Sequence, residues 1–171
     1  MDLILELDME KCVACGACAV ACMDQNDFQV EPGALPFRTV RCSEGQAEGG
    51  VRYRNLSLAC MHCKDAPCIR ACPSGCLSKD LETGFTVYDS AVCIGCRSCA
   101  AACPFGAPRF GPDGKMHKCD GCVDRVKAGL EPACVRICPF DALSLRSREE
   151  VRREGESGSL YRAAQQVWKE V

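Results

Sequence analysis

Short apolar stretches of five to eight residues recur along the chain, separated by loops rich in cysteine. Their residues alternate in polarity or include β-branched side chains, a pattern that favours strands over helices, although stretches this short separate the two poorly. We therefore predict strands at 3–7, 51–58, 84–89 and 142–147. No apolar run is long enough to span a membrane, so no direct membrane insertion is expected.

Two stretches do not follow this alternation of short apolar segments and cysteine-rich loops. Residues 27–55 are rich in glycine and glutamate, and we expect an irregular connection there. The region 149–171 is predicted to be a linker, centred on "GESGS", followed by a C-terminal helix. This helix is expected to pack on the protein's own surface, with docking onto a partner as the alternative. Its apolar face would comprise Leu160, Ala164, Val167, Trp168 and Val171.

Cysteine changes this picture most, because 18 of the 171 residues are cysteines. Such a density indicates either a disulfide scaffold or a metal protein. The opening residues, "MDLILELDMEKC", show no basic segment followed by an apolar one, so no signal peptide is expected. We therefore expect a cytoplasmic protein whose cysteines bind metal. Export with a signal-bearing partner, or membrane association through another subunit, is the alternative.

Sixteen of the cysteines form four copies of one pattern, and each copy ends in C-x-x-x-C. In three copies proline follows the last cysteine, whereas Met23 follows it in the first. The copies are Cys12, Cys15, Cys18 and Cys22; Cys60, Cys63, Cys68 and Cys72; Cys93, Cys96, Cys99 and Cys103; and Cys119, Cys122, Cys134 and Cys138.

This spacing is typical of [4Fe–4S] ligation. Three cysteines in a tight loop converge on one cluster, while the fourth, about one helical turn onward, ligates the other cluster of a pair. Proline then ends the helix. Zinc is the competing interpretation, because two C-x-x-C hooks separated by a longer stretch also bind it, and the last copy fits that description. The first and third copies do not, so we predict four [4Fe–4S] clusters.

The chain resembles the four-cluster electron-transfer (beta) subunits of the dimethyl sulfoxide reductase, formate dehydrogenase and polysulfide reductase family. The resemblance runs from about Cys12 to Leu145. It includes the cysteine copies together with "CPSG", "CIGCRSCAAACPFGAPRF", "KCDGC" and "PACVRICP".

The resemblance implies how the copies pair. It implies an α+β fold of two fused ferredoxin-like two-cluster modules, an inner one over 56–114 and an outer one formed by 1–26 with 115–148. It also implies four ligand sets, here numbered clusters 1 to 4: Cys12, Cys15, Cys18 and Cys138; Cys60, Cys63, Cys68 and Cys103; Cys93, Cys96, Cys99 and Cys72; and Cys119, Cys122, Cys134 and Cys22.

The function implied is non-catalytic electron relay to or from a large molybdenum or tungsten pterin subunit. The sequence agrees, since we find no phosphate loop and no nucleophile paired with a base. A relay in a hydrogenase-linked complex and a freestanding polyferredoxin are the alternatives. The formal charge of −2 argues against a general nucleic-acid binder. Four clusters would lower the total to about −10.

A few residues near the cysteine loops invite further predictions. Cys76 is expected to be a small buried residue and Cys42 an exposed thiol. His62 is expected either to donate a hydrogen bond toward a sulfur or to face solvent, and His117 to be exposed. Three arginines inside the loops either offset the cluster charge or lie on the surface: Arg70, Arg97 and Arg136.

Overall fold

The structure, a computed structural model, describes residues 1–28, 36–154 and 159–160. Short helices alternate with small antiparallel sheets, which agrees with the predicted α+β class. Within the described residues, no helix is long and apolar enough to cross a membrane. The predicted C-terminal helix lies outside the described residues except for Leu160, which is partly buried against the core.

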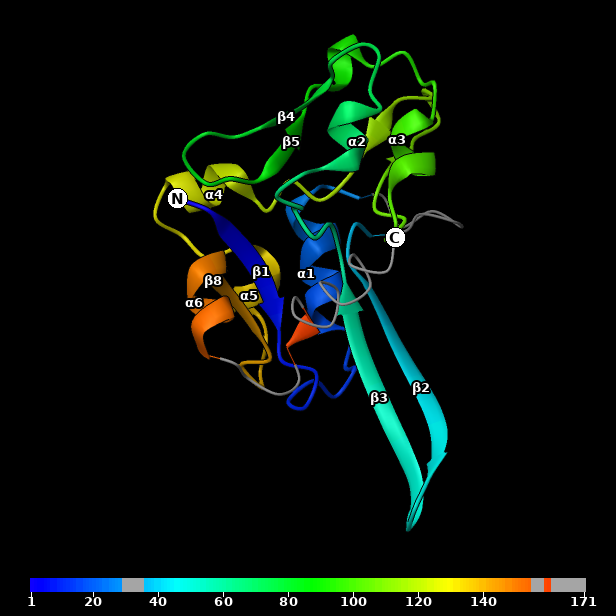
Figure 1. The fold of residues 1–171 in the computed structure, drawn as a ribbon, viewed down its shortest axis with the longest axis vertical. Helices are drawn as coiled ribbons and strands as arrows, with labels where there is room; N and C mark the ends of the chain where they lie inside the picture. Colours follow the sequence, from blue (N-terminus) through cyan, green and yellow to red (C-terminus); the bar gives the residue numbers. More distant parts are fainter. Residues whose placement is uncertain (29–35, 155–158, 161–171) are drawn as a thin grey trace.

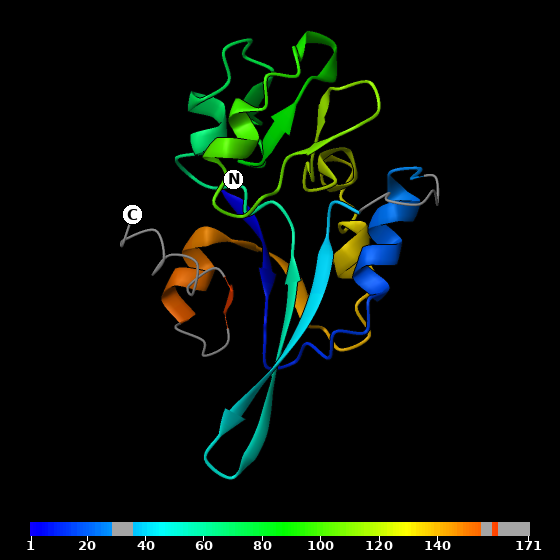
Figure 2. The same ribbon diagram turned by 90° about the vertical axis from the view of Figure 1, so that its right-hand side faces the viewer.

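Each sheet in the described part of the chain pairs two strands. The first and last strands join the two ends of the chain, and the second and third form a hairpin that projects from the rest of the protein (Figures 1 and 2). All four predicted strands are confirmed. The pairs are β1 (Leu3–Leu7) with β8 (Leu143–Ser147), β2 (Thr39–Ala47) with β3 (Gly50–Leu58), β4 (Leu77–Lys79) with β5 (Thr86–Tyr88), and β6 (Arg109–Phe110) with β7 (Met116–His117).

The helices are short, and proline explains where several of them end. Three helices stop one or two residues before a Cys-Pro pair, whereas α1 runs through Cys22 because Met23 replaces the proline. The helices are α1 (Ala17–Gln25), α2 (Pro67–Arg70), the 3₁₀ turn η1 (Ser90–Val92), α3 (Ser98–Ala102), α4 (Val123–Lys127), α5 (Ala133–Arg136) and α6 (Arg148–Glu154).

The expectation of an irregular connection over 27–55 is wrong from residue 39 onward. Strand β2 pairs with β3 along its whole length, from Thr39 opposite Leu58 to Ala47 opposite Gly50. Its sequence, "TVRCSEGQA", contains too few apolar residues for a clear alternation. Backbone pairing with the neighbouring strand makes it a strand, and a pattern search within one segment cannot detect that.

Helix α6 was not predicted, although the sequence holds a signal for it. The Ser147 hydroxyl accepts a hydrogen bond from the Glu150 backbone N–H at 3.2 Å, and the Glu150 carboxylate accepts one from the Ser147 N–H at 2.8 Å. This reciprocal pair is a capping box, which S-x-x-E at 147–150 encodes. Val151 anchors the helix in the core.

The apolar core is small and built partly from cysteines. Leu5, Leu7 and Leu143 pack with Cys18 and Cys134 where the first and last strands meet. A second cluster combines Leu77 and Met116 with Cys68, Cys76 and Cys99. In Figure 1 the segments carrying this second cluster, coloured green, lie at one end of the protein, and the blue β1 and the orange β8 lie together below them. The interior is thus arranged around thiols.

Candidate metal centres

The four cysteine loops share one backbone feature. The residue just before the second cysteine of each loop has a left-handed φ: 56° at Ala14, 43° at His62, 68° at Gly95 and 79° at Gly121. A left-handed residue reverses the chain tightly. The sulfurs on either side of it can therefore face a common point, and the sequence repeat is also a repeat of local structure.

At two of these positions only glycine fits. A Cβ at Gly95 would lie 2.7 Å from the Gly114 carbonyl oxygen, and one at Gly121 would lie 2.5 Å from the Phe85 ring. Both distances are shorter than carbon atoms tolerate. The third and fourth loops therefore reverse the chain tightly and also pack closely against neighbouring segments.

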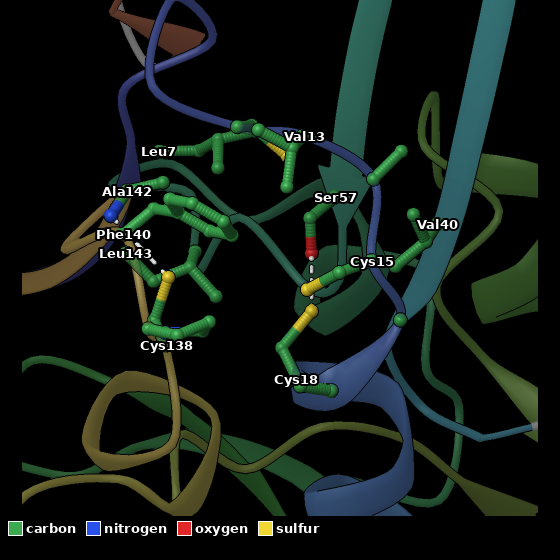
Figure 3. Close-up of a pocket in the computed structure, with 15 residues that line it drawn as sticks. Leu7, Val13, Cys15, Cys18, Val40, Ser57, Cys138, Phe140, Ala142 and Leu143 are labelled. Atoms are coloured by element: carbon green, nitrogen blue, oxygen red, sulfur yellow. Dashed lines mark hydrogen bonds between the residues drawn. The ribbon is translucent and has the colours of Figure 1, made fainter.

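One cavity is lined by four thiols that come from opposite ends of the chain. Cys12, Cys15 and Cys18 belong to the first loop, and Cys138 follows α5. Figure 3 shows the Cys15 and Cys18 sulfurs beside the Ser57 hydroxyl, with Cys138 across the cavity. Burial raises the pKa of Cys12, the Ala14 N–H lowers it, and the other three thiols raise it further.

A second cavity has the complementary composition. Cys119, Cys122 and Cys134 belong to the fourth copy, and Cys22 comes from α1 in the first. Helices α1 and α5 contact each other, which places the two cavities side by side. Burial raises the pKa of Cys122 to about 11, with Cys134 and Cys22 among the neighbours that add to the effect.

The second copy gathers three thiols around one from the third. Burial raises the pKa of Cys63 to about 12, and the next largest causes are Cys60, Cys103 and Cys68. Such mutual influence requires the thiols to be neighbours. Cys103 also accepts a hydrogen bond from the Ala107 N–H at 3.4 Å.

The remaining thiols gather around the third copy. Burial raises the pKa of Cys99, the Ala100 N–H lowers it, and the neighbouring thiols Cys68, Cys72 and Cys93 raise it further. Cys96 also lies within range of Cys72. The Met116 N–H donates to the Cys93 sulfur at 3.4 Å. Each of the two cavities therefore draws three thiols from one copy and one from another, and thiols of the second and third copies are neighbours of one another.

These sites fit a polynuclear cluster better than a single ion. In a zinc site, four sulfurs converge to about 2.3 Å from one atom and leave no space between them. Here four thiols line each of two cavities, and space remains between them. Within the described residues, no group of three or more His, Cys, Asp or Glu side chains is arranged to hold one metal ion.

Buried cations lie among the thiols, and they are not the arginines proposed from the sequence. Arg70, Arg97 and Arg136 are exposed, so their surface alternative is the correct one. Three other cations are buried instead: Arg38 and Arg148 at 3% and Lys118 at 1% exposure. Nothing in their local sequence marks them, because each is buried by contacts with distant segments.

Arg38 lies between the two outer cavities. Its guanidinium donates to the Ser57 carbonyl and hydroxyl oxygens at 3.0 and 3.1 Å. Burial acts to lower its pKa, but thiols of both cavities outweigh that effect and raise it. A guanidinium is permanently charged. Arg38 therefore supplies a fixed positive charge to both cavities, whose nearby thiols are Cys134, Cys119, Cys18 and Cys22.

His62 is fully buried, so the expectation that it faces solvent is wrong. Its Nδ1 accepts a hydrogen bond from the Thr86 N–H at 3.0 Å, which leaves the proton on Nε2. Nε2 lies 3.7 Å from the Cys119 sulfur. Burial, followed by Lys118 and other cations, holds the pKa of His62 well below its usual value. A neutral ring therefore donates to a sulfur of the fourth copy, although His62 belongs to the second.

We expect His62→Met to lower the reduction potential of the cluster bound by Cys119 by a few tens of millivolts. Reduction adds negative charge, which an N–H···S bond stabilises, and for one electron 59 mV corresponds to a tenfold change in equilibrium. Potentiometric titration followed by EPR measures the shift. His62→Gln, which keeps an N–H donor, is the control and should shift the potential less. Identical potentials in His62→Met and the unmodified protein would contradict this role.

The remaining residues near the loops are placed as follows. His117 is half-buried rather than exposed, because its ring lies edge-on to Tyr88 with centroids 5.9 Å apart. Cys42 is exposed on the hairpin, as predicted, and Cys76 is buried, as predicted. Leu160 and Ser159 extend the core at the chain end, where Ser159 bridges to Asp8.

Comparison with known proteins identifies related sequences. Residues 51–148 match the family described as "4Fe-4S dicluster domain", and residues 9–23 match "4Fe-4S binding domain". The chain is 41% identical over 154 residues to the B subunit of the anaerobic dimethyl sulfoxide reductase of Escherichia coli, covering 86% of this chain and 75% of that protein. The Haemophilus influenzae protein of the same name is 38% identical over 155 residues, covering 85% and 74%.

A second group of relatives carries a different name. The chain is 36% identical over 159 residues to the iron-sulfur subunit of the nitrate-inducible formate dehydrogenase of Escherichia coli. The match covers 85% of this chain and 54% of that protein. The chain therefore spans about half of this relative and three quarters of the first.

Proposed function

We propose that this chain, which belongs to the 4Fe–4S dicluster family, is a non-catalytic electron-transfer subunit. Its relatives in that family include the iron–sulfur subunits of dimethyl sulfoxide reductases and formate dehydrogenases. Its electrons would pass to or from a large molybdenum or tungsten pterin subunit. The arrangement of the sixteen thiols carries the proposal. They belong to four copies of one spacing, and four of them line each of the two cavities, which supports four [4Fe–4S] clusters.

We assign the ligands as the resemblance implies. The thiols of the two cavities are those of clusters 1 and 4, and the two remaining groups are those of clusters 2 and 3. The crossing of thiols between the first and fourth copies supports an outer module of 1–26 with 115–148. The crossing between the second and third supports an inner module over 56–114. The contact of α2 with α3 within that range agrees with it.

Neighbouring thiols from different groups suggest the order of the clusters. Arg38 links clusters 1 and 4, as described above. Cys119 of cluster 4 lies near Cys60 of cluster 2, and Cys68 of cluster 2 lies near Cys99 of cluster 3. The proposed sequence is therefore 1, 4, 2, 3, with clusters 1 and 3 at the ends. Each end would meet a separate redox partner.

The chain's own residues perform three tasks in this relay. When bound, the clusters supply one-electron redox chemistry. The thiols hold them, backbone N–H groups of residues such as Ala107 and Ala142 donate to the sulfurs, and the apolar side chains around the cavities exclude water. Arg38, Lys118 and His62 set the local electrostatics.

Metal analysis of protein purified without oxygen tests the proposal. We expect about sixteen iron and sixteen sulfide per chain, EPR signals of interacting clusters on reduction, and copurification with a large pterin-containing subunit. Zinc in place of iron, or about eight irons, would refute the four clusters. Copurification with a hydrogenase instead, or isolation as a stable monomer, would refute the proposed partner.

A further inference from the structure

Cys76 occupies a position that alanine fills elsewhere in the chain. In the third and fourth copies, the residue four places after the last cysteine is Ala107 or Ala142. Their N–H groups donate to the Cys103 and Cys138 sulfurs at 3.4 and 3.3 Å. The equivalent residue in the second copy is Cys76, whose backbone bonds the Cys72 thiol in the same way. The local structure is thus repeated, but here a thiol replaces a methyl group.

The Cys76 sulfur points into the proposed site of cluster 3. It lies 3.6 Å from the Cys72 sulfur, and its thiol is also within hydrogen-bonding reach of Cys93. The residue is only 4% exposed, and it packs in the apolar cluster that contains Cys99. This site therefore contains five sulfurs, one more than a [4Fe–4S] cluster requires.

The backbone next to Cys76 leaves room for adjustment. Gly75, the residue before it, has a φ of 68° and no atom within 4 Å of the place where a Cβ would lie. A metal–thiolate bond is about 2.3 Å long. An iron bound to Cys72 therefore lies within reach of Cys76 after a small rotation of its side chain.

We propose that Cys76 is a reserve ligand for cluster 3, an inference that rests on the ligand set proposed above. While Cys72 is bound to iron, Cys76 remains a protonated thiol beside the Cys72 sulfur and does not bind iron. When the bond from iron to Cys72 breaks, the Cys76 sulfur binds the same iron and its proton passes to the Cys72 thiolate. One iron–sulfur bond forms and one breaks, and no electron is exchanged.

Cysteine-to-alanine variants of the full chain, purified without oxygen, test the reserve ligand by iron content and EPR. Cys72→Ala should retain about sixteen irons, with an altered EPR signal for one cluster. Cys72→Ala/Cys76→Ala should lose that cluster, or one iron of it. If Cys72→Ala alone loses as much iron as the double variant, the proposal is overturned. An unmodified protein with fewer than four clusters would instead refute the proposed function.

The third copy provides a matched control, because Ala107 occupies the position after Cys103 that Cys76 occupies after Cys72. Cys103→Ala should lose a cluster, as the Cys72→Ala/Cys76→Ala variant does. Adding Ala107→Cys to it should restore about sixteen irons. Retention of all four clusters in Cys103→Ala would show that three thiols suffice, and it would overturn the rescue assigned to Cys76. Failure of Ala107→Cys to restore the cluster would also count against the proposal.

Discussion

Removal of iron is expected to unfold this protein. Most of its helices have four or five residues, and each sheet of the described chain has two strands. Helices shorter than about twelve residues and isolated hairpins are marginal in water. Aromatic residues make up only 6% of the sequence, so the apolar core cannot compensate. The bonds between iron and thiolate should therefore supply much of the folding free energy.

Circular dichroism and limited proteolysis of protein treated with an iron chelator measure this loss. We expect loss of the cooperative thermal transition and rapid cleavage throughout the chain. Protein kept without oxygen and without chelator is the control. An apo-protein that still unfolds cooperatively and resists protease would refute the prediction.

Reconstitution with iron and sulfide should be more efficient at pH 8.5 than at pH 6.5. Thiols must lose their protons to bind metal. A cysteine in the unfolded apo-protein has its ordinary pKa of about 8.5, and as the chain folds, burial raises the pKa of Cys63 to about 12 and that of Cys122 to about 11. In either state most thiols are protonated at neutral pH, so protons compete with iron and the competition weakens as the pH rises. Iron content after reconstitution at the two pH values measures the difference, and equal contents would contradict the prediction.

Exchange of ligands between the first and fourth copies should be visible in double variants. If Cys12 and Cys138 hold the same cluster, Cys12→Ala/Cys138→Ala should lose no more clusters than either single variant. Cys134 and Cys138 are only four residues apart but are assigned to different clusters. Cys134→Ala/Cys138→Ala should therefore lose two clusters, or about eight irons.

Iron content and the number of EPR-active clusters distinguish the two arrangements. If each copy bound its own cluster, the results would be reversed: the Cys12 and Cys138 pair would cost two clusters, and the Cys134 and Cys138 pair only one. That outcome would refute the crossed ligand sets. Equal yields of folded protein, judged by gel filtration, are needed for the comparison.

The sequence predicts the chemistry of this protein better than its electrostatics. Sixteen cysteines at repeated spacings indicate iron–sulfur clusters, because ligand spacing within a loop is a local property. The strands at the chain ends were also predictable, since "LILEL" and "ALSLRS" carry their own alternation. Family membership confirms the cofactor class, whereas the individual ligand sets remain predictions.

The interior charges could not be predicted. Arg70, Arg97 and Arg136 lie inside the cysteine loops and yet are exposed, whereas Arg38 comes from outside any loop and is buried between two cavities. The contact between His62 and a sulfur could not be predicted either, because that sulfur belongs to Cys119, 57 residues away. Burial and partner choice depend on which distant segments meet, and one segment's pattern does not contain that information.

The number of thiols and the tight loops that carry them can be read from the sequence, because both follow from residues within a few positions of one another. Three other features depend on the fold: β2 pairs with β3, Arg38 and His62 lie beside sulfurs, and Cys76 lies next to Cys72 and Cys93. These arrangements arise from long-range packing, in which segments remote in the chain bury each other's polar groups.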